Sequence, residues 1–502
     1  MDSEHGENEP GYSPSHVQDP EGSTIAEIQT AQQETDSTAT GILGSNNVQT
    51  PEPKNKQDPA HESKLLSLPP EIIDQILYYV SARDLACAST TCRTLANHGY
   101  NELLWADIVN ANLPSKIDTP GPFPSFRSLY VAHHPYWFLP RNKIWFSDSA
   151  ATGNLILTRY DNRRGVIEGY RVVAEKRSVQ FRTWDYDSEV IIQSFTPRVR
   201  LWLDDPVILL KNTTCAPLSR RQYLHGEIRM PMPLESQHVY NSLSLCTGEI
   251  PPDEKASPDK QWPPLTIPSR NRVYRNGAVH WSEWDNRPQN IRQVSEFAFR
   301  VRRWAHFRMG LPIFAAGSSE TMSTYATLEP ELYIPTREKP YQGIWVGDYS
   351  DHGCEFLLFL QRGKGSVSSS SSIEQAGGEG HTHAAENEVA EEGEIQGDGL
   401  IQKGSLEAIK LTGDPNVPRG EISWISEDIG PGGLVRIAEE DPFRGARMVR
   451  SRGHVAHLGF RDDKFLSSQL ILISRDCIAH YWEDLDHISY FYRVDIDELL
   501  RT

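Results

Sequence analysis

Four residues that lie close together in the sequence, Asp348, Tyr349, His352 and Glu355, carry side chains that could do chemistry. Carboxylate and imidazole groups are the usual components of metal sites and of acid–base catalysis. These four lie at a predicted strand–turn–strand junction, however, and side chains alternate between the two faces of a strand. A single hairpin does not make them converge, so we predict neither a metal site nor catalytic residues here.

The other candidate groups are weaker. His381 and His383 lie in an acidic loop, and the three-residue spacing of His454 and His457 puts them on opposite faces of a predicted strand. The six cysteines include no CxxC pair and are expected to be small buried hydrophobes in a reducing compartment. The sequence has no GxSxG, HExxH, P-loop or dinucleotide-binding motif. We therefore expect no cofactor and assign catalysis to partners.

An apolar stripe follows the polar N-terminal segment. The run Leu68-Pro-Pro-Glu-Ile-Ile predicts the start of a helix with a proline in its first turn, and Ser81 is placed to cap a second helix. A third helix would carry Cys92, Leu95 and the run Leu103-Leu104-Trp105. Three short helices in about 45 residues form too small a unit to bury their own apolar surface. An outward apolar face here predicts a protein partner.

Beyond a short predicted helix at Phe126–Val131, the pattern changes to strands. Short runs that alternate or are β-branched recur, with Gly165–Val173 and Ser178–Trp184 as two of them. A further helix is expected at Ile291–Trp304. About eleven short strands and few helices predict a closed or nearly closed antiparallel β-barrel. The predicted fold class is therefore α+β, with three short helices followed by a large antiparallel barrel.

The acidity of the chain is confined to two segments that are too polar to build a core. Residues 1–62 hold twelve Asp and Glu against two Lys, and residues 366–403 hold eight against one Lys. Together they carry −17 of the net charge of −18. We predict a disordered tail (1–63) and a disordered acidic loop (366–403). The remainder shows no basic stripe for nucleic acid and no run that could span a bilayer, so we expect a cytoplasmic or nuclear protein that binds neither.

The segment from Leu68 to Trp105 resembles the F-box in the order and spacing of its residue classes, with Leu68-Pro-Pro-Glu-Ile-Ile, Ser81-Ala-Arg-Asp-Leu, Ser89-Thr-Thr-Cys-Arg-Thr-Leu and Leu104-Trp105. In that family the leading Leu-Pro and the apolar helix faces bind a Skp-type linker protein, which joins a cullin scaffold with the ubiquitin-transfer machinery. The resemblance implies a linker-binding role for Leu68, Pro69, Ile72, Ile76, Leu77, Leu85, Cys92, Leu95, Leu104 and Trp105.

The later part of the chain is similar to F-box-only proteins, fungal ones in particular, whose receptor domain is a β-barrel. The similarity rests on Trp137-Phe-Leu-Pro, Lys143-Ile-Trp-Phe-Ser-Asp, Gly343-Ile-Trp-Val-Gly-Asp-Tyr and Leu411-Thr-Gly-Asp-Pro-Asn-Val-Pro-Arg-Gly. It implies a substrate-recruiting subunit of an SCF-type ubiquitin ligase. The expected domains are an F-box (64–110), a helical and aromatic linker (111–143) and a barrel (144–502) that contains a Pro-rich elaboration (212–290). Because this insert and the acidic loop are longer than the family pattern, the target protein is not implied.

If the barrel reads a target protein, Asp348, Tyr349 and His352 are predicted to line its mouth; the alternative is that they only stabilise the hairpin turn. Two other functions stay open. The barrel could bind or hydrolyse a small molecule, with the helices as a cap, or the F-box could work without a cullin. A small-molecule site should have an apolar interior cavity, whereas a peptide reader should have a polar-rimmed mouth.

Overall fold

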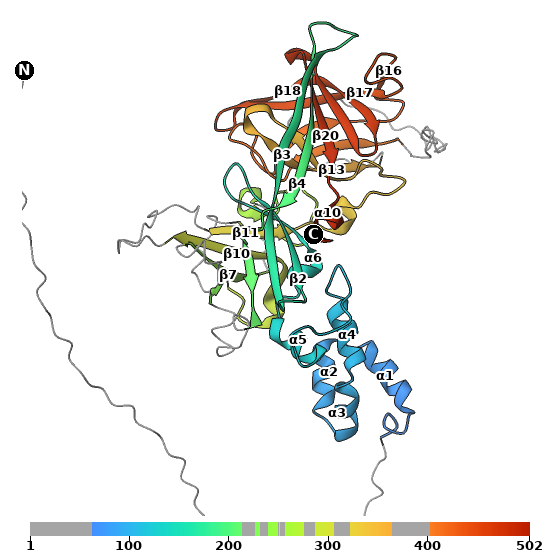
Figure 1. Ribbon diagram of the computed structural model, residues 1–502, viewed down its shortest axis with the longest axis vertical. Helices are drawn as coiled ribbons and strands as arrows, with labels where there is room; N and C mark the ends of the chain where they lie inside the picture. Colours follow the sequence, from blue (N-terminus) through green and yellow to red (C-terminus); the bar gives the residue numbers. More distant parts are fainter. Residues whose placement is uncertain are drawn as a thin grey trace, which may run out of the picture. The chain divides into compact units, whose positions relative to one another are not determined.

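The computed structural model describes residues 63–212, 226–230, 239–248, 250, 257–275, 287–305, 322–363 and 402–501. The predicted acidic tail and loop lie almost entirely outside these ranges. Helices come first and strands follow, which confirms the predicted α+β order (Figure 1). None of the helices in the described ranges is long and apolar enough to cross a membrane.

The first two helices begin as predicted. Helix α1 (Pro70–Tyr78) has its proline at the first position, where the missing N–H costs nothing. Helix α2 (Ala82–Ser89) is capped by Ser81, whose hydroxyl accepts a hydrogen bond from the Asp84 N–H at 3.2 Å.

The predicted third helix is wrong in its extent, because two helices occupy that segment: α3 (Arg93–Gly99) and α4 (Glu102–Asn110). Gly99 ends α3 where the chain passes so close to α2 that a Cβ there would lie 1.9 Å from the Ser89 hydroxyl. Asn101 then starts α4 by accepting a hydrogen bond from the Leu103 N–H at 3.0 Å. Next come α5 (Phe126–His133), close to its predicted position, and α6 (Phe138–Asn142).

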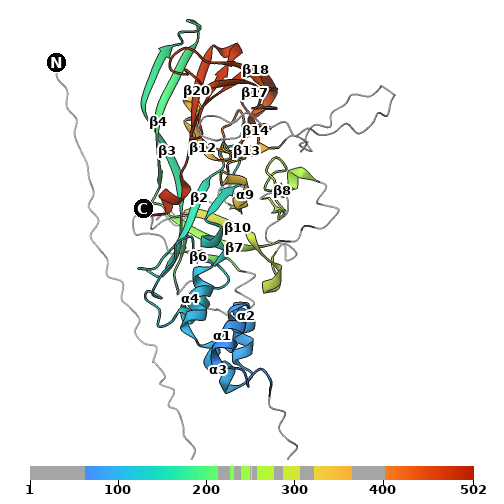
Figure 2. The ribbon, with the colours of Figure 1, turned by 90° about the vertical axis from the view of Figure 1, so that its right-hand side faces the viewer.

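Eight antiparallel strands close into a barrel, because the last strand pairs with the first (Figure 2). The closing strand, β20, lies in a segment where the sequence predicted no strand. Closure leaves no open sheet edge among these eight strands. In the order in which they pair, the strands are β12 (Gly343–Asp348), β13 (Cys354–Arg362), β14 (Ser405–Lys410), β15 (Ile422–Ser426), β17 (Arg447–His457), β18 (Arg461–Ser474), β19 (Cys477–Trp482) and β20 (His487–Arg493).

The earlier strands form a second antiparallel sheet around a core of its own. Its central side chains include Trp145, Phe299 and Tyr325, and α6 contributes Phe138 and Leu139 to that core. In the order in which they pair, its strands are β6 (Ile228–Met230), β7 (Val239–Thr247), β10 (Val294–Ala305), β11 (Met322–Thr327), β1 (Ile144–Ser147), β2 (Leu155–Asp161), β3 (Val166–Thr183) and β5 (Ile208–Leu210).

The helix predicted at Ile291–Trp304 is wrong. Only a 3-10 turn, η4 (Ile291–Gln293), precedes β10. The run Phe299-Arg-Val alternates, so that Phe299 and Val301 enter the core of the second sheet while Arg300 lies on the other face, where its guanidinium donates to the Tyr274 carbonyl. A period of two is the strand pattern, and it overrides the helical propensity of the flanking residues.

One long ribbon links the two β-structures. The two strands predicted at Gly165–Val173 and Ser178–Trp184 are a single strand, β3, which pairs with β4 (Ile191–Leu201) through an irregularity between Arg177 and Gln180. Strand β3 starts in the second sheet and continues along the barrel (Figures 1 and 2). Pro197 is tolerated in β4 because β4 pairs with β20 only at residues 191–193. Pro197 therefore has no paired strand on the side that faces away from β3, where its missing N–H would be needed.

Two apolar layers outside the barrel join these parts. One lies between strands β12 to β14 and the second sheet, and it includes Ile144, Leu157, Val346 and Leu358. The other lies between strands β17 to β20 and the ribbon. The remaining elements are β8 (Gln261–Trp262), β9 (Val273–Tyr274), β16 (Leu434–Ile437), α9 (Pro330–Tyr333), α10 (Ile496–Arg501) and the 3-10 turns η2 (Pro258–Lys260), η6 (Ser350–His352) and η7 (Glu483–Leu485).

Candidate functional site

The four N-terminal helices enclose a small apolar core. Leu77, Leu85, Leu104 and Trp105 are buried in it, at 6% exposure or less. Trp105 also donates its indole N–H to the Gly99 carbonyl at 2.8 Å. These four of the ten residues to which the resemblance gave a linker-binding role therefore hold the helices together, since their side chains are not open to a partner.

The other residues of that set lie at or near the surface. Ile72 and Ile76, one turn apart on α1, are each 41% exposed, and Leu68 is 36% exposed beside the exposed Pro69. Cys92 and Leu95 are half-buried; the Cys92 sulfur accepts from the Leu95 N–H and caps α3. Large exposed apolar side chains extend the surface around α1 and α4, and they are Leu65, Leu66, Tyr78, Tyr79, Tyr100 and Leu103.

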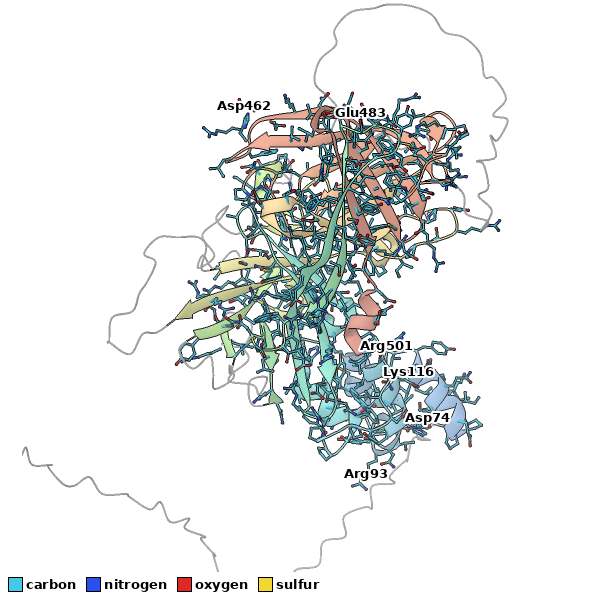
Figure 3. All side chains as sticks on the ribbon, turned by 45° about the horizontal axis from the view of Figure 1, so that its top comes forward. Asp74, Arg93, Lys116, Asp462, Glu483 and Arg501 are labelled. Atoms are coloured by element: carbon cyan, nitrogen blue, oxygen red, sulfur yellow. The ribbon has the colours of Figure 1, made fainter. Side chains whose placement is uncertain are left out.

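A polar contact fixes α1 against the start of α4. The Asp74 carboxylate, which Figure 3 labels on the helical region, lies 2.8 Å from His98 Nδ1 and accepts a hydrogen bond from Asn101 Nδ2 at 3.2 Å. Because Asp74 lies on the same helix as Ile72 and Ile76, this contact helps to hold the exposed apolar residues in a defined orientation. We call Leu65, Leu66, Leu68, Ile72, Ile76 and Tyr79 the α1 surface.

The interior of the closed barrel is filled by aromatic rings. Trp345 stacks on Phe359 with ring centroids 4.5 Å apart, and Trp424 and Phe491 pack against Phe359 at 4.6 and 5.8 Å. His480 lies against Trp424, fully buried, and burial lowers its pKa to about 3, so its ring is neutral at physiological pH. These rings pack closely against one another at this level of the barrel.

A buried charged cluster lies next to these rings. The Lys410 ammonium is 2.9 Å from Glu355 Oε2 and 2.6 Å from Asp414 Oδ2, and all three side chains are at most 5% exposed. Burial raises the pKa of Glu355 to about 8, an effect that Lys410 opposes. For Asp414, burial raises the pKa, but the Lys410 charge together with hydrogen bonds from Lys410, Glu355 and the Val417 N–H outweighs burial and lowers the pKa. Within the cluster, burial therefore favours the protonated form of Glu355, while the ionised form of Asp414 is favoured.

The three residues predicted to line the barrel mouth do not converge. Asp348 is buried and accepts from Lys176 Nζ at 2.9 Å and Gln193 Nε2 at 2.6 Å, so it ties the ribbon to the barrel. Tyr349 points to the buried cluster: its hydroxyl lies 2.6 Å from Ser423 Oγ, and Lys410 lies 4.2 Å from its ring centroid. His352 is exposed in η6. These contacts give Asp348 and Tyr349 structural roles.

The turn after Leu411 is also fixed by several hydrogen bonds and by a contact between a guanidinium group and an aromatic ring. The Asp414 carboxylate accepts from the N–H groups of Asn416 and Val417 at 2.6 and 2.9 Å. Arg419 is 9% exposed, stacks over Trp262 at 4.9 Å and donates its backbone N–H to the Ala151 carbonyl. The turn thus links the barrel to the loop between β1 and β2.

A polar pocket of about 360 Å³ lies at one end of the second sheet. The sequence patterns do not reveal this pocket, because its residues come from six separate segments and none stands in a recognisable motif. The only available hint was the placement of Arg and Asn in strands whose neighbours are apolar. The pocket is lined by Ser149, Asn154, Arg171, Asp205, Val207, Asn241, Val301, Arg303, Ser323 and Tyr325.

Within the described residues, no group of three or more His, Cys, Asp or Glu side chains is placed to hold a metal ion. The arrangement consists instead of an exposed apolar helix surface, a filled barrel and a polar pocket. Of these features, the exposed apolar helix surface is the one that is typical of a protein interface.

Comparison with known families agrees with this class. Residues 65–111 match the family model of the F-box-like domain, which supports an F-box protein. F-box domains bind Skp-type linkers and are characteristic of non-catalytic adaptor subunits. Residues 325–498 match the model of the Cyclin D1 binding domain, a span that includes all eight strands of the closed barrel.

A curated relative shares a shorter stretch. The chain is 24% identical over 199 residues to Protein EXECUTER 2, chloroplastic, of Arabidopsis thaliana. The matched stretch is 39% of this chain and spans only 26% of the length of that protein.

Proposed function

We propose that this chain is the substrate-recruiting subunit of an SCF-type ubiquitin ligase. Its F-box would bind a Skp-type linker and through it a cullin, and its β-region would hold a target protein in the cytoplasm or nucleus. The rate gain would come from proximity between the target and the ubiquitin-loaded enzyme, so the chain itself needs no catalytic group. The Cyclin D1 binding domain match supports a protein as the target.

The observation that carries the proposal is the α1 surface within the F-box-like match. Isolated exposed apolar residues are ordinary, but a group of this size on one small helical unit marks a protein interface. Burying apolar surface stabilises by roughly 25 cal/mol per Å². Ile72 and Ile76, each 41% exposed and one turn apart, would therefore contribute directly to the free energy of linker binding.

The test is co-purification with a Skp-type linker. We expect Ile72→Asp with Ile76→Asp to abolish the complex, because two carboxylates would be buried without partners. Leu68→Ala with Pro69→Ala should weaken it strongly. Lys116→Asp is the control, since Lys116 is exposed in the loop after α4 and is not part of the α1 surface, and it should leave the complex intact.

Circular dichroism and melting temperature of the free variants must stay close to wild type for this result to count. Normal co-purification of the Ile72/Ile76 variant would remove the linker-binding proposal. A stable complex with the linker that recruits no cullin would instead favour the F-box protein that works without one.

A small-molecule or hydrolytic barrel is less well supported. It requires an apolar cavity inside the barrel, and that space is occupied by Trp345, Phe359, Trp424 and Phe491. Binding of a target protein to an outer or end surface does not need such a cavity.

A further inference from the structure

The pocket at the end of the second sheet is continuous with that sheet's core. Its residues on β10 and β11 follow the same strand faces as the core: Val301 and Arg303 continue the face of Phe299, and Ser323 continues the face of Tyr325. Phe299 and Tyr325 stack at 5.3 Å beneath it. The interior of this sheet is therefore apolar in the middle and becomes polar and open at one end.

The charge of the pocket is positive. Arg303 contacts Asp205 through both terminal nitrogens, at 2.9 and 3.1 Å, and Arg171 Nη2 contacts the same carboxylate at 3.1 Å. Among the residues that line the pocket, two guanidinium groups thus share one carboxylate, which is an excess of one positive charge. Arg171 Nε is also buried with no hydrogen-bond partner among the described residues, so this guanidinium has a donor to spare.

A buried acceptor lies in the same lining. Asn241 is 1% exposed and donates its amide to the carbonyls of Pro206 and Val207 at 3.2 and 3.3 Å, while its Oδ1 has no partner in the described part of the chain. Rotating the amide would set its oxygen against two carbonyl oxygens, so the observed orientation is fixed. An unpaired buried acceptor costs about 1–3 kcal/mol, which a ligand N–H would recover.

Hydroxyl groups complete the rim. Ser149 Oγ lies 2.8 Å from Ser323 Oγ and 3.0 Å from Ser147 Oγ, so the hydroxyls form a chain that can turn donors toward an anion. The pocket thus offers guanidinium and hydroxyl donors beside one amide acceptor. A polypeptide that carries an acidic group next to its backbone N–H matches this set.

We propose that this pocket binds an anionic group of the target polypeptide, a carboxylate or a phosphoryl group, between Arg171 and Arg303, with a peptide N–H of the target donating to Asn241 Oδ1. The inference rests on the proposed function, because it names the place where the target is read. It moves that place from the closed barrel to the second sheet.

The test is calorimetric titration of the full chain, purified with its linker, against capped peptides Ac-Gly-Ala-X-Ala-Gly-NH₂ in which X is phosphoserine, glutamate or serine. A fourth peptide, Ac-Gly-Ala-Ser-Ala-Gly with a free carboxylate, distinguishes a chain end from a side chain. We expect at least one anionic peptide to bind and the neutral peptide not to bind. Inorganic phosphate should compete only weakly, because it cannot donate a peptide N–H to Asn241.

Substitutions in the pocket should change the affinity for the anionic peptide in opposite directions, which a purely structural role of these residues would not produce. Arg171→Gln and Arg303→Gln should each weaken binding about tenfold or more, as expected for a lost charge-assisted hydrogen bond. Asp205→Asn should strengthen binding severalfold, because it removes the carboxylate that competes with the ligand. Arg270→Gln, at a side chain 89% exposed and outside the pocket, is the matched control and should have no effect.

Failure to bind any anionic peptide would overturn the inference, as would weaker binding by Asp205→Asn at an unchanged melting temperature. Equal binding of phosphate and the peptides would overturn the peptide assignment. Linker co-purification is measured on the same samples, so loss of peptide binding with an intact linker complex leaves the proposed function standing.

Discussion

The closed barrel and the second sheet are built from similar antiparallel strands, but they differ in whether the strands close into a ring and in what fills the interior. In the barrel, β20 pairs with β12 and completes the ring, and the interior is filled by stacked aromatic side chains. In the second sheet, β5 and β6 meet without a described backbone ladder: the Leu209 N–H donates to the Met230 sulfur at 3.4 Å. Its interior opens into a polar pocket. The closed sheet therefore encloses a packed interior, whereas the second sheet carries the pocket that we propose as the binding site.

The charged groups differ in the same way. Lys410 and its two carboxyl neighbours are at most 5% exposed, and both carboxyl groups lie within 2.9 Å of the Lys410 ammonium. Arg171 and Arg303 are 37% and 44% exposed and share a single carboxylate. Buried charges that compensate one another position a chain turn, whereas a partly exposed excess of charge can attract a ligand.

Truncation inside the barrel should have the largest effect on stability. Trp345→Ala removes a fully buried ring between Phe359 and the barrel wall, and we expect it to cost about 3–5 kcal/mol of unfolding free energy. Phe181→Ala on the ribbon, 66% exposed, is the aromatic control and should cost less than about 0.5 kcal/mol. Chemical denaturation measures both. Equal losses in the two variants would contradict the contrast between filled interior and exposed ribbon.

The buried cluster should make stability depend on pH. The pKa of Glu355 is raised from 4.5 to about 8 in the folded protein, so between these values the folded state binds one more proton than the unfolded state. Its contribution to stability therefore decreases as pH rises from about 4.5 to about 8 and is level above.

Glu355→Gln lacks this titration and keeps the side-chain shape. Its unfolding free energy relative to wild type should increase across the same pH window, by an amount on the order of a few kcal/mol, since each pKa unit corresponds to about 1.4 kcal/mol. Glu427→Gln, at a side chain 70% exposed, is the control for the substitution and should change the unfolding free energy by less than about 0.5 kcal/mol. If Glu355→Gln changed the unfolding free energy by the same amount at pH 5 and at pH 8, Glu355 would be ionised in the folded protein at both pH values.

A smaller effect is expected where the ribbon is attached to the barrel. Asp348→Asn weakens the contacts to Lys176 and Gln193 and should cost about 1–3 kcal/mol, with faster amide exchange in the ribbon. His352→Ala, four residues later and exposed, should change neither quantity. If both variants behaved like wild type, the Asp348 contacts would not stabilise the attachment of the ribbon, and a role of Asp348 in target binding would have to be tested instead.

The sequence predicted the local features that depend on near neighbours. The proline start of α1 and the Ser81 cap were predictable because a helix terminus is decided within four residues. The apolar stripe on α1 was equally visible, but which of its residues are buried was not. Leu77 packs on residues of α2 and α4, while Ile76 beside it remains exposed, and only the tertiary arrangement separates them.

The candidate site shows the same limit more strongly. Asp348, Tyr349 and His352 looked like one group because they are adjacent in sequence, yet pleating sends Asp348 toward the ribbon and Tyr349 toward the barrel interior.

What the sequence by itself determined is that short capped helices precede antiparallel strands and that the helices carry an apolar stripe; these follow from local propensity and periodicity. What only the tertiary structure decided is which strand closes the barrel and that Arg171, Asp205, Asn241 and Arg303 meet at one pocket. The physical reason is that pairing register and sheet closure depend on contacts between residues far apart in the chain, which no local pattern records.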